Sequence, residues 1–222
     1  RYNLFDPKTT CLSRKPIKQK KIMTEFDDEI INLWPTKIFK RYLKNHHEPN
    51  RLLIQLIRQL DKGQKNITTD YNQSNFLEND NEATNWLRGS INDAVIDYLR
   101  SNLIDYSVNW SIQAWPNINR FGDYHDPHNH PHCYLSGTYY LKVPNGQEIG
   151  SRKDLRPNQI TFYDPRPGVN MGSIAKDPNI DPEFTVHPEP GILMLWPAFL
   201  NHFIHPNLTK QTRISISFNI IL

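Results

Sequence analysis

Residues 125–132 combine histidines at spacings that suit metal binding. The segment holds four of the chain's nine histidines: His125, His128, His130 and His132. Histidine is the commonest protein ligand for transition metals. Because residues i and i+2 of an extended segment point to the same side, His128 and His130 can present two imidazoles to one ion. With the later His202 closing the site, the donor set suits non-haem iron with open positions for substrate and oxygen.

The residues leave other ligand sets open. A histidine before a strand is often just a polar surface residue, and a histidine tract can bind metal adventitiously. Asp126 and His128 also have the i, i+2 spacing, so a carboxylate could replace one imidazole. We therefore expect either His128, His130 and His202, or a set that uses His125 or Asp126.

The C-terminal run of residues 213–220 alternates polar and apolar residues without a break. The alternation predicts a strand with Arg213, Ser215 and Ser217 on one face and Ile214, Ile216 and Phe218 on the other. An arginine on an inward face needs an anionic partner, because an unpaired buried charge is very costly. Its planar fork suits a carboxylate, so a small dicarboxylate could span from the metal to Arg213. The alternative is that Arg213 pairs with a surface acid.

The elements before this region are predicted to be a strand at 33–43 and two helices. The first helix covers 50–60, with Asn50 as N-cap and Gly63 as the stop, because its apolar residues recur at helical spacing. A surface loop is expected over residues 65–81. The second amphipathic helix is expected over roughly 82–103.

The remaining chain changes to short β-rich runs separated by proline-containing turns. Such a pattern indicates a sandwich or barrel. We therefore expect a mainly β (α+β) fold, a jelly-roll barrel with supporting N-terminal helices. The expected strands cover residues 108–115, 134–143, 159–163, 183–187, 191–196 and 213–222.

Composition and charge limit the possible partners. The 222 residues suffice for one domain with a substantial core, and a net charge of +3 gives little support for a nucleic-acid role. The basic run at 14–21 is local, and we interpret residues 1–22 as a flexible extension, with a nucleic-acid or targeting arm as the alternative. Residues 23–222 are expected to form a single domain, with the strand and helices over about 30–105 and the barrel over about 106–222.

The cysteines and the hydropathy pattern indicate in which cellular compartment the chain is expected. Two cysteines, Cys11 and Cys133, cannot form a disulfide framework, which suits a reducing compartment. The sequence shows no apolar stretch of the ~18–20 residues that a membrane span needs, and no signal-peptide core. We therefore expect a cytoplasmic protein, in its own organism or in a viral host cell. Its oligomeric state stays open, a homodimer included.

The run from residue 110 to 222 resembles the 2-oxoglutarate- and Fe(II)-dependent oxygenase superfamily. It is most similar to a bacterial and viral branch whose HxH motif is followed by SG-YY, and residues 33–39 resemble the N-terminal strand of that branch. The resemblance covers about half of the chain, and its segments follow in the order that the family requires. The matching segments are 117–124, 128–131, 135–140, 162–166, 190–197, His202, 206–207 and 213–219.

One departure from the superfamily concerns the metal ligands. Most members place a carboxylate where His130 stands, which gives two histidines and one acid. Three neutral imidazoles would leave Fe(II) its full charge until an anion binds.

The resemblance implies a double-stranded β-helix fold and an activity. It implies Fe(II) as cofactor, 2-oxoglutarate as cosubstrate and stimulation by ascorbate. The metal would bind the C1 carboxylate and 2-oxo group while Arg213 pairs with the distal carboxylate, assisted by Ser215 and Tyr140. Oxidative decarboxylation to succinate would then be coupled to hydroxylation of a peptidyl or small-molecule substrate.

Three other residues are interpreted as lying outside the metal and cosubstrate sites. Arg166 follows a strand in an expected loop and is either a substrate contact or a solvated turn residue. His132 and His205 are interpreted as lying around the ligands or at the surface.

Two rival functions remain from the sequence. One is a cupin-like metalloenzyme with three histidines that does not use 2-oxoglutarate; such an enzyme has no need of a dicarboxylate anchor at Arg213. The other is a non-catalytic jelly-roll module that binds a partner or has a structural role. Retention of the three histidines together with Arg213 argues against the second rival.

Overall fold

The computed structural model describes residues 35–61, 75–144, 152, 154–166, 177 and 180–222. Thr36–Leu222 forms one compact unit, while nearly all of Arg1–Pro35 lies outside the described residues. The basic extension expected at 1–22 and the helix stop expected at Gly63 therefore lie outside them too.

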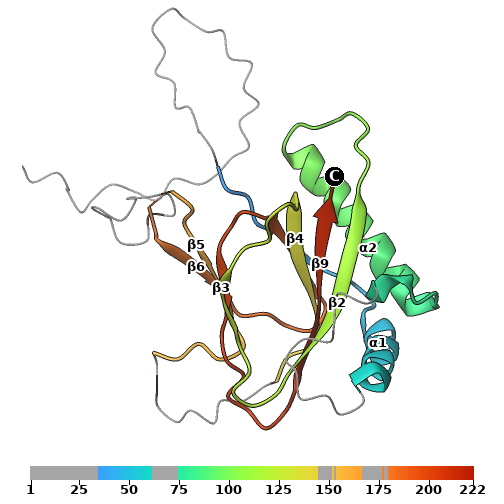
Figure 1. Cartoon of the computed structure of the whole chain (residues 1–222), viewed down its shortest axis with the longest axis vertical. Coiled ribbons are helices and arrows are strands. Elements are labelled where there is room, and N and C mark those ends of the chain that lie inside the picture. The colour runs from blue at the N-terminus through green and yellow to red at the C-terminus, as the bar shows by residue number, and fades with distance from the viewer. Residues whose placement is uncertain (1–34, 62–74, 145–151, 153, 167–176, 178–179) are drawn as a thin grey trace, which may run out of the picture. The chain divides into compact units, whose positions relative to one another are not determined.

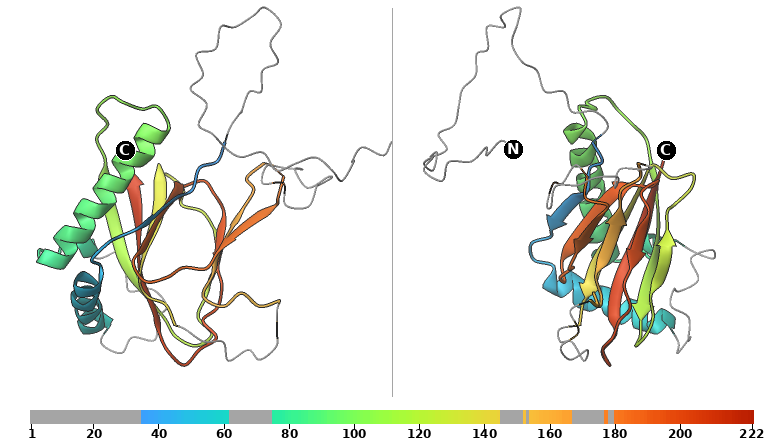
Figure 2. Two further views of the ribbon diagram at one scale, coloured as in Figure 1. Left: turned by 180° about the vertical axis from the view of Figure 1, so that it is seen from behind. Right: turned by 90° about the vertical axis from the view of Figure 1, so that its left-hand side faces the viewer.

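The described strands form two antiparallel sheets (Figures 1 and 2). Side chains from both sheets pack together in one buried cluster, so the sheets face each other across an interior. This is the double-stranded β-helix expected from the sequence. The larger sheet has the order β1 (Phe39–Tyr42), β7 (Ile192–Pro197), β4 (Leu135–Lys142), β9 (Arg213–Ile221) and β2 (Ser111–Asn119). The smaller sheet has the order β3 (His125–His128), β8 (His202–Ile204), β5 (Ile160–Tyr163) and β6 (Glu183–Val186).

Two helices, α1 (His47–Asp61) and α2 (Glu82–Ser101), cover the outer face of the larger sheet (Figures 1 and 2). Asn81 caps α2 by accepting from the backbone N–H of Thr84, whose side chain accepts from Asn81 in return. The apolar faces of both helices join the outward residues of the sheet in the main core. Among the described helices, none combines the length and apolar character that a bilayer span requires.

The alternation predicted for the C-terminal strand is confirmed. Ile214, Ile216 and Phe218 of β9 lie in the core under the helices. Arg213, Ser215 and Ser217 line the cavity between the sheets instead. The polar face of β9 is therefore the inner face of the barrel.

The expected start of the first helix was wrong. The helix begins at His47, and Pro49 is compatible with its first turn because the first backbone N–H groups of a helix need no intrahelical acceptor. Asn50 is buried rather than capping: it accepts from the Tyr139 hydroxyl at 2.6 Å and donates to the Leu141 carbonyl at 3.2 Å. The residue thus fastens α1 to the sheet.

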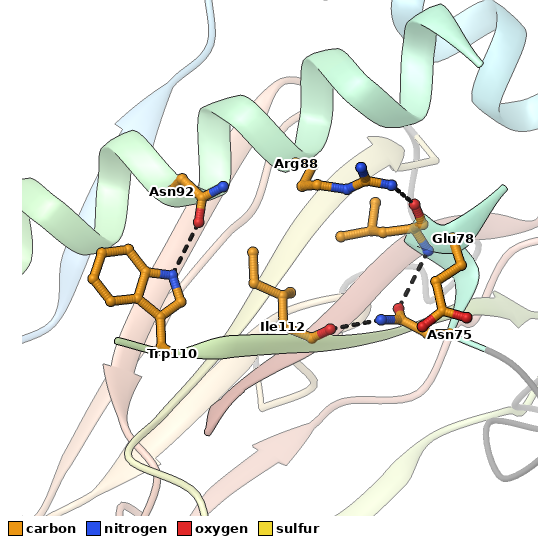
Figure 3. Close-up of a pocket in the computed structure, with 7 residues that line it drawn as sticks. Asn75, Glu78, Arg88, Asn92, Trp110 and Ile112 are labelled. Atoms are coloured by element: carbon orange, nitrogen blue, oxygen red, sulfur yellow. Dashed lines mark hydrogen bonds between the residues drawn. The ribbon is translucent and has the colours of Figure 1, made fainter. Parts of the chain in front are cut away.

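The first part of the loop expected over 65–81, residues 65–74, lies outside the described residues. The rest of the expectation was partly wrong, because Phe76–Glu78 forms a 3-10 helix, η1, with two buried apolar residues. Asn75 before it pairs with the free edge of β2 as a strand would (Figure 3). Its amide donates to the Ile112 carbonyl at 2.6 Å and accepts from the Ala114 N–H at 3.0 Å. Farther along the same strand, Pro116 lacks an N–H. Both features limit pairing of this edge with another chain.

Gly137 of β4 packs too closely for any side chain. A Cβ added there would lie 2.4 Å from Cζ of Phe218 and 2.6 Å from the backbone oxygen of Met194. Because a backbone atom cannot rotate away, Gly137→Ala should lower the free energy of unfolding by about 1–3 kcal/mol. Equilibrium unfolding in urea measures this change.

Gly89→Ala in α2 is the matched control, since a Cβ there has no neighbour within 4 Å. Alanine is the better helix former, so this variant should gain about 0.5–1 kcal/mol. A Gly137→Ala variant as stable as Gly89→Ala would contradict the close packing of β4.

Candidate metal centre

The centre of the site is a pair of histidines on neighbouring strands. His128 ends β3 and His202 begins β8, and the two residues are direct partners in the antiparallel pairing. Direct partners project from the same face of a sheet, and here both imidazoles line the cavity with ring centroids 4.3 Å apart. The register of two short strands therefore brings together residues that lie far apart in the sequence.

His130 joins this pair from just beyond β3. Its backbone N–H donates to the Ala198 carbonyl at 2.9 Å, which fixes the chain after the strand. Its ring centroid lies 5.4 Å from that of His202, and the two rings are nearly parallel, with an interplanar angle of 6°. The same ring stacks on Trp115 at a centroid distance of 6.0 Å. The i, i+2 spacing thus places His128 and His130 on one side, as predicted.

Backbone carbonyls orient two of the imidazoles. Nδ1 of His202 lies 3.1 Å from the Leu200 carbonyl, and Nδ1 of His128 lies 2.5 Å from the Asp126 carbonyl. Because a carbonyl can only accept, Nδ1 carries the proton in both rings. Nε2 of each ring is left as the lone-pair donor, an arrangement typical of metal-binding histidines.

Burial keeps two of the ligand candidates, His130 and His202, uncharged. Desolvation, with a smaller effect of His128, lowers the pKa of His202 to about 3. The same causes lower the pKa of His130 to about 4, against the opposing effect of a side-chain hydrogen bond with Asn219. Neutral imidazole is the form that binds a metal, so no proton has to leave these two rings at pH 7.

The three rings lie close enough to hold one metal ion after a small movement. One nitrogen from each of His128, His130 and His202 lies within 4.8 Å of the others. Three nitrogens bound to one ion at about 2.1 Å lie about 3.0–3.6 Å apart, so the rings need to close by no more than about 2 Å.

The alternative ligands lie differently. Asp126 has an exposed side chain, and its backbone oxygen rather than its carboxylate contacts His128. His125 lines the cavity, but the group of nitrogens described above does not include it. His132 is exposed, as expected.

Arg213 lies in the same cavity as the histidines. Its side chain is 1% exposed, and one guanidinium N–H donates to the His205 carbonyl at 3.4 Å. Among the described residues, none forms a carboxylate ion pair with it, and its Nε has no hydrogen-bond partner. In the described chain, therefore, no acid lies within ion-pair distance of Arg213.

The charge on Arg213 persists despite its burial. Desolvation lowers the pKa of Arg213 to about 10, while Tyr140 and then Asp123 act to raise it. The guanidinium is therefore still a cation at pH 7, enclosed in an interior where an unpaired charge is costly.

Tyr140 and Ser215 lie beside Arg213. They are partners across β4 and β9, and both line the cavity. Burial raises the pKa of Tyr140 to about 12, so its hydroxyl is a hydrogen-bond donor at neutral pH. The three residues that the sequence analysis assigns to 2-oxoglutarate, Tyr140, Arg213 and Ser215, thus lie in one cavity.

Sequence reasoning assigned no role to two asparagines of this cavity, Asn117 and Asn119. The first is 1% exposed and donates to Ser217 at 2.8 Å; the second is fully buried and lies opposite Arg213 in the β2–β9 pairing. The signal that could have found them is the polar alternation at 117 and 119, which matches an inward strand face.

Arg166 and His205 lie outside the lining of this cavity. Arg166 is exposed and binds the Asp164 carboxylate through Nε at 3.0 Å and Nη2 at 2.6 Å. Its substrate contact stays a prediction. The ring of His205 bonds the buried Thr161 hydroxyl at 2.7 Å, and only its backbone reaches Arg213.

Another cavity, of about 310 Å³, lies between α2, η1 and β2 (Figure 3). Four of the side chains that line it are already hydrogen-bonded. Trp110 donates to Asn92 at 2.9 Å, Arg88 donates to the Leu77 carbonyl, and Asn75 is held by β2. Groups already hydrogen-bonded have little to offer a ligand, so the cavity between the sheets is the better candidate site.

Comparison with known proteins gives a family match for the barrel. Residues 113–219 match the family model described as "Putative 2OG-Fe(II) oxygenase". Among curated proteins, none is similar enough to this chain to count as a relative.

Several solved structures share the fold at low sequence identity. A prolyl-4-hydroxylase from Pseudomonas putida matches with a TM-score of 0.55 and 12% identity, over 83% of this chain and 91% of that one. A Trichoplax adhaerens prolyl hydroxylase, in complex with a hypoxia inducible factor peptide fragment, matches with a TM-score of 0.53 and 13% identity, over 83% of each chain. HygX from Streptomyces hygroscopicus, with nickel and 2-oxoglutarate bound, matches with a TM-score of 0.52 and 11% identity, over 83% of this chain and 81% of that one.

The family match spans the strands that carry the histidines and Arg213, and the similar structures share the double-stranded β-helix. The region 113–219 of the chain thus belongs to the oxygenases that use Fe(II) and 2-oxoglutarate.

Proposed function

We propose that this protein is a hydroxylase of a peptidyl or small-molecule substrate, with Fe(II) held by His128, His130 and His202. The observation that carries the proposal is Arg213. It is a buried cation, without a carboxylate partner in the described chain, and it lines the same cavity as the three histidines. A dicarboxylate that reaches from the metal site to Arg213 would neutralise the charge of the guanidinium.

In this proposal the three histidines bind the metal ion through ring nitrogens that their neighbours orient. His128 and His202 present Nε2 because their Nδ1–H groups donate to carbonyls, and His130 is held through Trp115 and Asn219. Three neutral ligands leave the site with more positive charge than two histidines and one acid would. The site therefore favours an anionic cosubstrate.

Arg213 is assigned to the distal carboxylate of 2-oxoglutarate. Its guanidinium can donate two parallel hydrogen bonds to a carboxylate, a geometry that lysine lacks. The protonated hydroxyl of Tyr140 and the hydroxyl of Ser215 add donors on the neighbouring strands.

The cofactor supplies the oxidation, and the chain supplies the surroundings. When bound together, Fe(II), 2-oxoglutarate and O₂ supply the chemistry that forms succinate and CO₂ and hydroxylates a substrate C–H bond. Buried Trp196 and Phe162 pack around His202 with ring centroids at 4.9 and 6.1 Å, and they exclude water from that side.

Release of CO₂ from 2-oxoglutarate labelled at C1 tests the activity. With Fe(II) and ascorbate we expect slow release without substrate and faster release with the true substrate. Because prolyl hydroxylases are among the similar structures, proline-containing peptides belong in the panel beside amino acids and small metabolites. No release across the panel, from protein that binds Fe(II), would favour a metalloenzyme that does not use 2-oxoglutarate.

A further inference from the structure

Five side chains that line the barrel cavity have buried hydrogen-bonding atoms without a partner in the described chain: Asn117, Asn119, His125, Trp196 and Arg213. Two of these five are Asn119 and His125. Asn119 is 0% exposed, and neither its amide nitrogen nor its amide oxygen has a partner. Nε2 of His125 is likewise buried and without a partner. Buried polar groups are nearly always hydrogen-bonded, so groups that lack a partner while lining a cavity point to a ligand.

Both residues line the same cavity as the cation already assigned to 2-oxoglutarate. Asn119 is the direct partner of Arg213 in the pairing of β2 with β9, so the two side chains leave neighbouring strands on the same face. His125 begins β3 on the opposite sheet, where its partner Ile204 also lines the cavity.

His125 is near both His128 and Arg213. Its ring centroid is 6.3 Å from that of His128, and it is close enough to Arg213 to be affected by the guanidinium charge. Asn119, His125 and Arg213 therefore approach the same region from three different strands.

We propose that Asn119 and His125 bind the distal carboxylate of 2-oxoglutarate together with Arg213, an inference that rests on the proposed function. A carboxylate has about four lone-pair positions. The amide of Asn119, Nε2–H of His125 and the guanidinium supply donors from both sheets. His125 and Asn119 are thus specificity-determining residues, because a 2-oxo acid without the distal carboxylate would leave their donors unpaired.

The test compares two ligands on the Fe(II)-loaded protein under anaerobic conditions. 2-Oxoglutarate has the distal carboxylate, and 2-oxobutyrate lacks it but keeps the metal-binding end. Affinities are measured from the metal-to-ligand charge-transfer absorption and by calorimetry, with Fe(II) stoichiometry and thermal unfolding recorded for each variant.

The variants separate hydrogen bonding from packing. Asn119→Ala and His125→Leu remove the donors, and each should weaken 2-oxoglutarate binding by about tenfold or more. His125→Gln keeps an N–H near the position of Nε2 and should stay within about threefold of the parent, less than the loss of one such bond. Binding of 2-oxobutyrate should change little in all three variants.

Three outcomes contradict the inference, and they can be told apart. If the donor-free variants bind 2-oxoglutarate as the parent does, the inference fails while the proposed function stands. If both ligands lose affinity equally, or if His125→Gln loses as much as His125→Leu, the residues act through packing. If the parent itself binds no 2-oxoglutarate, the inference and the proposed function fail together.

Discussion

Replacing His202 by alanine should abolish stoichiometric Fe(II) binding. His202 is 2% exposed, pairs directly with His128, and contributes one of the three nitrogens that converge in the cavity. The loss should exceed the roughly 10- to 100-fold that removing a mere outer-shell partner costs a metal site. Anaerobic titration with Fe(II), followed by calorimetry, measures the affinity and stoichiometry.

Two further substitutions make this test specific. His130→Ala should behave like His202→Ala, whereas His132→Ala should bind Fe(II) normally, because His132 is exposed and outside the group of nitrogens. Circular dichroism of each variant checks that the fold is retained. Normal iron binding by His130→Ala, together with loss in Asp126→Ala, would show that the ligand set includes the carboxylate instead.

Arg213 should carry the largest effect on cosubstrate binding. Arg213→Lys keeps the charge but loses the bidentate fork, so the affinity for 2-oxoglutarate should fall by about tenfold or more, since a charge-assisted hydrogen bond contributes roughly 1.5–3 kcal/mol. Arg213→Ala should fall further. Affinity for Fe(II) without 2-oxoglutarate should hardly change, because the proposed metal site consists of the three histidines and does not include Arg213.

The stability of Arg213→Met distinguishes a ligand-binding arginine from a structural one. A buried cation without a carboxylate partner in the described chain destabilises the ligand-free fold, so an apolar residue of similar length should raise the thermal midpoint. Arg120→Met is the control: Arg120 is ion-paired with Asp61 at 2.6 Å, so that variant should gain no stability and should keep its 2-oxoglutarate affinity. A lower midpoint for Arg213→Met, with unchanged 2-oxoglutarate binding, would place the anchor elsewhere.

Elements with a strong local pattern could be predicted well from the sequence. The helix expected over 82–103 is observed as Glu82–Ser101, and the strand expected over 213–222 is observed as Arg213–Ile221. Both depend on a periodicity that repeats several times within one segment, which identifies the element and its apolar face without knowledge of a partner.

Elements without such a pattern could not be predicted. The strands β3 and β8 are only four and three residues long, and their histidines replace the apolar alternation that marks a strand. Asn50 was taken for a cap because asparagine favours that position, yet its amide bonds Tyr139 and Leu141 across the core. In both cases contacts with distant segments outweigh local preference.

The sequence by itself determined which groups are available for chemistry and which of them share a face. The spacing of His128 and His130 placed two imidazoles together, and the alternation after Arg213 put the cation on the polar face of its strand. Only the tertiary structure decided that His202 lies opposite His128, that Asn119 lies opposite Arg213, and that no described acid neutralises the guanidinium. The reason is that strand register joins segments distant in the chain, and it is set by packing of the whole barrel rather than by the residues of either strand.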